Sequence, residues 1–129
     1  FGWHRNNMLG ATVQRNRWSQ QGGLTGWLEF FGRERLGALR EQLAAAHAAH
    51  ELLDTIDRVI NALPAFFADG YIPQPGLVHG DLWSGNWGCL AQGHGTPVIF
   101  DPAVSISDKE AELAMMELFG QPPPGFWPA

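Results

Sequence analysis

Three polar residues in one short loop, and a fourth beyond a predicted turn, have the types and order that phosphoryl transfer needs. His79, Asp81 and Asn86 form the pattern H-x-D-x-x-x-x-N, and Asp101 follows an apolar run at 98–100. Kinase-like catalytic loops hold an Asp and an Asn at this same spacing, and a second Asp follows where the D-F-G motif stands. The sequence therefore predicts that these residues form one site.

The chemistry of the reaction suggests a role for each side chain. A phosphoryl group in transfer carries charge on its equatorial oxygens, so catalysis depends on positioning and on neutralisation by Mg²⁺. Magnesium prefers oxygen ligands and usually takes only one or two from the protein. Asp101 would supply a charged ligand and Asn86 a neutral one, which leaves Asp81 to accept the proton of the attacking hydroxyl. Gly80 and Gly85 suit a loop that turns sharply beside a ligand.

Each of these residues also has a purely structural interpretation. Asp81 could be a turn residue, and Asn86 could cap a turn with its side chain. His79 is predicted to brace its loop rather than to do chemistry, because it ends the short apolar segment Leu77-Val78. The combination, with flanking glycines and a β-branched run before Asp101, favours the functional interpretation.

The segments that carry these residues closely resemble the fructosamine (ketosamine) kinase family. The matching runs are LVHGDLWSGN at 77–86, PVIFDPA at 97–103, EAELAM at 110–115, LFG at 118–120, FGW at 1–3 and GAT at 10–12. Trp83 makes the motif specific, because aminoglycoside and choline kinases share H-x-D and the later Asp but usually not H-G-D-L-W-x-G-N. The resemblance covers nearly the whole chain, more loosely in the middle helices.

The resemblance implies ATP- and Mg²⁺-dependent phosphorylation of the sugar part of ketosamines, the small-molecule or protein-bound products of amine glycation. In that family the phosphorylated adduct is unstable and is lost, so the activity repairs glycated amines. By position, Asp81 corresponds to the catalytic base, Asn86 and Asp101 to the metal ligands, and Trp83 to a surface for the sugar. Sugar C–H faces pack well on an indole. The alternative for Trp83 is a core tryptophan that braces the loop.

A few positions depart from the family pattern. Aromatic residues and a glycine are usual after the D-P-A run, where Ser105-Ile106-Ser107 stands here, and Lys109 replaces a frequent Arg. Glu112 replaces a frequent Asp, and three prolines at 122–124 follow the LFG run. These changes concern the substrate rim and the anchoring of the metal loop, and they leave the predicted catalytic set intact.

The predicted fold is α+β and mostly helical, the C-terminal lobe of a protein-kinase-like fold in which a small β-hairpin carries the site. A two-lobed kinase needs roughly twice the length of this chain. No G-x-G-x-x-G loop is present, and the single lysine, Lys109, lies after the catalytic loop. We therefore expect residues 1–129 to be a partial catalytic lobe without the ATP clamp or the final helices, and to be inactive alone.

Hydrophobic periodicity predicts the helices. Apolar stripes indicate helices near 24–31 and 52–63, and an alanine-rich helix is expected at 38–49. Gly32 and Gly37 are expected to end the first helix before the alanine-rich helix begins.

Strands and a capped helix are predicted further along the chain. Strands are expected at 87–90 and 97–101, joined by a glycine-bearing turn that brings Asn86 and Asp101 to one end. The capping box from Ser107 to Glu110 predicts the start of the last helix. The segment 1–26 has no clear period and is interpreted as a long ordered loop that lines the substrate cleft.

Composition narrows the expected partners and compartment. The formal net charge of −5 disfavours nucleic acid, although arginines and aromatic residues alternate in the first segment. Cys89, the single cysteine, cannot form an internal disulfide and is predicted to be a small buried residue in a strand. No apolar run is long enough to span a membrane and the start lacks a signal-peptide pattern, so a cytoplasmic protein is expected.

Two alternatives to a ketosamine kinase stay open at this point. The chain could be a non-catalytic, kinase-like remnant that binds nucleotide or a partner without turnover. It could also be a small-molecule kinase of the aminoglycoside or choline type. The H-G-D-L-W-x-G-N motif argues against the second alternative, and the phosphate-binding lysine and loop, if they are encoded upstream, would argue against the first.

Overall fold

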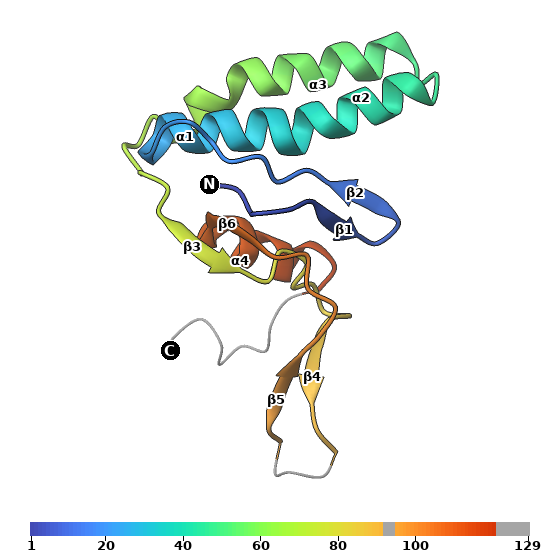
Figure 1. The fold of residues 1–129 in the computed structure, drawn as a ribbon, viewed down its shortest axis with the longest axis vertical. Helices are drawn as coiled ribbons and strands as arrows, with labels where there is room; N and C mark the ends of the chain where they lie inside the picture. The colour runs from blue at the N-terminus through green and yellow to red at the C-terminus, as the bar shows by residue number, and fades with distance from the viewer. Residues whose placement is uncertain (92–94, 121–129) are drawn as a thin grey trace.

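The computed structural model describes residues 1–91 and 95–120, which form three tiers (Figure 1). A helical hairpin is the first tier, an N-terminal β-hairpin lies next to it, and a two-stranded sheet with one helix is the third. A second β-hairpin projects from the third tier, away from the helices (Figure 1). The predicted α+β class is therefore confirmed.

The helical hairpin has two arms. The first arm runs through α1 (Gly23–Phe30), a π-helical segment (Phe31–Gly37) and α2 (Ala38–Ala45) as one continuous helix. The second arm is α3 (His50–Ala62), which continues into a short 3₁₀ helix (Leu63–Phe67). The two arms pack side by side along their length (Figure 1).

The predicted helix break at the two glycines of the first arm was wrong. Gly37 has helical dihedral angles, φ −62° and ψ −41°. Gly32 is buried against the second arm, where a Cβ at its position would lie 3.5 Å from a methyl carbon of Leu63. Packing between the arms thus outweighs the roughly 0.5–1 kcal/mol that a glycine costs inside a helix. The alanine-rich helix ends at Ala45, before the predicted position 49, and His47 turns the chain with a φ of 59°.

The N-terminal segment contains a β-hairpin, so its interpretation as an irregular loop was wrong in part. Strands β1 (Asn7–Leu9) and β2 (Thr12–Gln14) pair antiparallel, with Asn7 opposite Gln14. Gly10 provides the left-handed turn residue, with a φ of 57°. Three-residue strands are too short to show an alternation of apolar and polar residues, which is why periodicity missed them.

The third tier is built on β3 (Pro75–Val78) and β6 (Ser105–Asp108), which pair antiparallel with Val78 opposite Ser105. Strand β6 was not predicted, because its sequence Ser-Ile-Ser-Asp carries little β-propensity. Ser107 lies within β6, so the predicted capping box from Ser107 to Glu110 was wrong. Helix α4 (Lys109–Leu118) follows β6 directly, and its first turn receives no side-chain cap.

The projecting hairpin confirms the two predicted strands near the site. Strands β4 (Trp87–Cys89) and β5 (Pro97–Ile99) pair antiparallel, with Trp87 opposite Ile99. This register places the residues just before β4 beside those just after β5. Cys89 is exposed on this hairpin, so its predicted burial was wrong.

Candidate active site

His79 joins the two loops on which the predicted site residues lie. Its backbone oxygen accepts a hydrogen bond from the backbone N–H of Ala103 at 2.8 Å. Its ring Nε2 lies 2.9 Å from the backbone oxygen of Phe100, which can only accept, so Nε2 carries the proton. The ring Nδ1 is then free to accept the backbone N–H of Asp81 at 3.3 Å. The predicted bracing role of His79 is thus confirmed.

Asp81 and Asn86 contact each other directly across their loop. The side-chain nitrogen of Asn86 donates to the Asp81 carboxylate at 2.9 Å and to the Asp81 backbone oxygen at 2.8 Å. Asn86 is 7% exposed, and its backbone N–H closes the turn by donating to Trp83. Only one oxygen of the Asp81 carboxylate is engaged by the residues that the structure describes. The other oxygen is therefore available to a substrate.

Asp101 occupies a strained position between two anchored residues. Its φ is 54°, a left-handed conformation that costs a non-glycine residue of order 1–3 kcal/mol. Phe100, just before it, donates its backbone N–H to the Asn86 backbone oxygen at 3.0 Å, and Ala103, just after Pro102, is tied to His79. The Asp101 carboxylate is exposed and forms no ion pair or hydrogen bond within 1–91 and 95–120. The fold thus holds a free carboxylate one residue away from the Asn86 backbone contact.

The donor set suits a hard divalent cation. Because the Asn86 amide nitrogen is committed to Asp81, its amide oxygen points away from that residue, and Asp101 offers an unpaired carboxylate. A neutral oxygen and a charged one are the ligand types that Mg²⁺ takes from proteins, with phosphates and water completing its shell. No group of three or more His, Cys, Asp or Glu side chains in the described part of the chain is arranged to hold a metal. The observed residues therefore fit a metal that is shared with a phosphorylated ligand.

Glu112 on α4 supports the loop at 79–86, a contact that the sequence analysis did not predict. Its Oε2 accepts the backbone N–H of Gly80 at 2.9 Å, while its Oε1 is buried with no partner among the described residues. Gly80 has a φ of 83°. The departure from the family pattern at Glu112 was the available signal, but Glu112 follows Gly80 by 32 residues, so the sequence did not indicate this contact.

Trp83 packs within the loop and is partly exposed. Its ring meets Phe119 edge-on at 5.5 Å between centroids, and it lies so close to Gly85 that no Cβ would fit there. Phe119 is 66% exposed. These contacts are those of a bracing tryptophan, and the exposed remainder of the indole leaves room for a ligand as well.

The other predicted features fall away from this site. The exposed histidines His47 and His50 lie where the chain turns from α2 into α3. Among the described residues, no helix is both long and apolar enough to cross a membrane. The prolines at 122–124 lie outside the described residues.

Comparison with known proteins assigns the chain to a family. The family model described as Fructosamine kinase matches residues 1–129. The chain is 42% identical over 127 residues to a "Probable ketoamine kinase" of Synechocystis sp., covering 98% of this chain and 39% of that protein. It is 35% identical over 115 residues to a "Protein-ribulosamine 3-kinase, chloroplastic" of Oryza sativa subsp. japonica, covering 89% and 31%.

A solved structure extends the likeness to the fold. A crystal structure of a "Putative fructosamine-3-kinase" from Haemophilus somnus matches with a TM-score of 0.71 at 25% identity, covering 98% of this chain and 39% of that one. The chain belongs to the fructosamine kinase family. It spans between about a third and two fifths of the length of these relatives.

Proposed function

We propose that the protein phosphorylates a sugar hydroxyl of ketosamines with ATP, and that Asp81 is the catalytic base. The observation that carries the proposal is the contact of Asp81 with Asn86, made while Asn86 also holds the strand end that precedes Asp101. One arrangement thereby presents a half-free carboxylate, an oriented amide oxygen and an unpaired carboxylate. These are the groups that phosphoryl transfer to a hydroxyl requires.

The substrate class follows from the relatives. Their names mention ketoamines and ribulosamine, which are sugars linked to an amine. Trp83 supports a sugar substrate, because it lies in the same loop as Asp81 and the exposed part of its indole can pack against C–H faces. The sugar hydroxyl would donate to the free oxygen of Asp81, which takes its proton as the phosphoryl group arrives.

Asn86 and Asp101 would hold Mg²⁺. When bound, the metal neutralises the charge on the phosphate oxygens and orients them. The chain's own contribution is the placement of the two oxygens, which the Asn86 contact with Asp81 and the anchors on either side of Asp101 provide.

We further propose that residues 1–129 form part of a catalytic lobe and that nucleotide-binding groups come from elsewhere in a longer protein. The length of the relatives supports this proposal, since the chain spans only 39% of the Synechocystis relative and 39% of the solved structure. The intact set of Asp81, Asn86 and Asp101 favours an enzyme over a non-catalytic remnant.

The test is a phosphorylation assay on the intact protein that carries this sequence. Fructosamine and ribulosamine derivatives of a free amino acid should be phosphorylated with ATP and Mg²⁺, while an aminoglycoside and choline should not. Turnover of an aminoglycoside or choline in place of the ketosamines would contradict the substrate class. Tight ATP binding without turnover of any of these compounds would instead favour the non-catalytic alternative.

A further inference from the structure

Strand β6 and the residues just before it have different hydrogen-bonding partners along their two edges. On one side lies β3, whose pairing extends beyond Val78 and Ser105 to the hydrogen bond between Ala103 and His79. On the other side, Ile106 exchanges two backbone hydrogen bonds with Gly2, at 3.0 and 2.8 Å. Main-chain pairing on this second side thus begins only at Ile106, two residues past Val104.

Two amide side chains from the N-terminal hairpin take the place of main chain at the preceding residues. Gln14 donates its Nε2 to the backbone oxygen of Ala103 at 2.9 Å, and Asn7 donates its Nδ2 to the backbone oxygen of Val104 at 2.7 Å. Ala103 is 1% exposed and Gln14 is 8% exposed. Buried carbonyl oxygens need donors, so these amides satisfy groups that would otherwise be unpaired.

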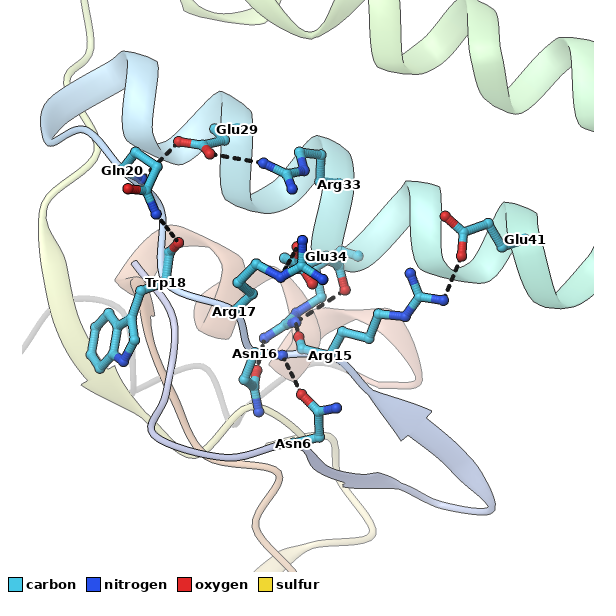
Figure 2. Close-up of polar contacts among 11 residues, drawn as sticks. Asn6, Arg15, Asn16, Arg17, Trp18, Gln20, Glu29, Arg33, Glu34 and Glu41 are labelled. Atoms are coloured by element: carbon cyan, nitrogen blue, oxygen red, sulfur yellow. Dashed lines mark hydrogen bonds and ion pairs between the residues drawn. The ribbon is translucent and has the colours of Figure 1, made fainter.

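The two amides are themselves held in one orientation. Asn7 and Gln14 are partners in the β1–β2 register, and Gln14 Nε2 also donates to Asn7 Oδ1 at 2.9 Å. The same oxygen accepts Asn16 Nδ2 at 3.0 Å, and the Asn16 oxygen accepts Arg35 Nη2 at 2.8 Å. Figure 2 shows Asn16 among the arginines of this region, with Asn6 holding its backbone. Because its donors and acceptors are fixed by neighbours, the pair cannot rotate without losing several hydrogen bonds.

We propose that Asn7 and Gln14 are positioning residues that set the place of the Asp101 carboxylate by clamping the backbone at Ala103 and Val104. Asp101 and Pro102 link the anchored Phe100 to the anchored Ala103, so the clamp fixes one of the two ends of this link. The strained φ of Asp101 persists only if both ends are held. The metal-binding part of this inference rests on the proposed role of Asp101; the clamp itself rests on the contacts above.

The experiment compares, in the intact protein, two changes that each remove one donor of the clamp with a control change at a neighbouring asparagine. Asn7→Asp keeps the size and the acceptor at Asn7 but places an oxygen against the Val104 carbonyl in place of the donor. Gln14→Met removes the donor to Ala103 without adding charge. Asn6→Asp is the matched control, because Asn6 acts there as an acceptor from the Asn16 backbone N–H and keeps that ability. Mn²⁺ binding in the presence of ATP is followed by electron paramagnetic resonance, with thermal unfolding and the KM for ketosamine measured alongside.

Both clamp variants should weaken the binding of Mn²⁺ by about 10–100-fold, the range of metal affinity lost when outer-shell partners of metal ligands are removed. The KM for ketosamine and the behaviour of Asn6→Asp should stay as in the parent. The added charge of Asn7→Asp would by itself attract the metal, so a loss cannot be an effect of charge. Lower thermal stability with unchanged Mn²⁺ affinity in both clamp variants would overturn the proposal and leave the two residues a purely structural role.

Hydrogen exchange separates failure of the clamp from failure of the proposed function. If the parent binds no Mn²⁺ with ATP, the proposed function fails, and exchange at the Phe100 and Ala103 amides then decides on the clamp. Faster exchange in Gln14→Met than in Asn6→Asp would support the clamp, whereas equal exchange would refute it. Gln14→Met also covers the case in which Asn7→Asp does not fold.

Discussion

No side chain larger than hydrogen fits at Gly80, because a Cβ there would overlap the backbone oxygen of Ala103. The loop at 79–86 and the loop that carries Asp101 therefore meet main chain to main chain, with His79 hydrogen bonded to both Phe100 and Ala103. This contact fixes the backbone next to Asp81 against the backbone two residues after Asp101. The glycine is needed for space as well as for its positive φ of 83°.

Gly80→Ala should separate the two loops. The new methyl group must push Ala103 away and strain a positive φ, which together should cost several kcal/mol, of which about 1–2 comes from the backbone conformation alone. We expect loss of phosphorylation with a lowered unfolding midpoint. Gly76→Ala, at a position where a Cβ meets nothing within 4 Å, is the matched control and should keep activity. Equal activity of the two variants would contradict the close contact.

How much the sequence could predict depends on the length and regularity of each feature. The loop at 79–86 has a specific motif, the two strands of the projecting hairpin are set by apolar runs around a glycine-bearing turn, and α3 has a regular apolar stripe, so these could be predicted. Strands β1, β2 and β6 are three or four residues long and rich in polar residues, so only their tertiary partners define them. The contacts of Glu112, Asn7 and Gln14 could not be predicted because each side chain acts on a backbone group far away along the chain.

The two glycines of the first helical arm should respond in opposite ways to alanine. Gly32→Ala places a methyl group at ordinary contact distance from Leu63 and Ile60, and it should stabilise the protein by about 0.5–1 kcal/mol through helix propensity. Gly37→Ala brings its Cβ to 2.9 Å from the backbone oxygen of Gly32, so it should destabilise. Chemical denaturation of both variants measures the change in unfolding free energy. Changes of the same sign and size in the two variants would contradict the continuous helix.

Tyr71, the only tyrosine of the chain, should make stability fall at high pH. Burial, and then its 2.9 Å hydrogen bond to Asp108, raise the pKa of Tyr71 to about 12. A raised folded-state pKa means that the folded protein holds the proton more tightly, so this stabilisation is complete below pH 10 and is lost as pH rises through about 12. Tyr71→Phe should be less stable than the parent by about 1–2 kcal/mol at pH 8. Denaturation of both proteins should show this gap closing by pH 12; a gap that stays constant with pH would contradict the raised pKa.

Trp83 can be tested as a sugar surface against its role as a brace. Trp83→Ala should raise the KM for ketosamine roughly 2–10-fold, the equivalent of one aromatic contact, with the KM for ATP unchanged. Phe119→Ala removes the bracing partner of Trp83 and serves as the comparison. If Phe119→Ala raises the KM for ketosamine as much as Trp83→Ala does, the tryptophan acts by bracing the loop.

The most direct test of the account compares Asp81→Asn with Asp101→Asn while Mg²⁺ is titrated at fixed ATP in the intact protein. An asparagine at 81 can still accept the hydrogen bond from Asn86, so the loop is kept while the base is lost. Asp81→Asn should therefore lower kcat by roughly 10²–10⁴-fold, the usual range for a general base, with the Mg²⁺ dependence unchanged. Asp101→Asn removes charge from the metal site and should weaken the response to Mg²⁺ together with kcat. Rescue of Asp81→Asn, but not of Asp101→Asn, by excess Mg²⁺ would contradict the assignment and reverse the two roles.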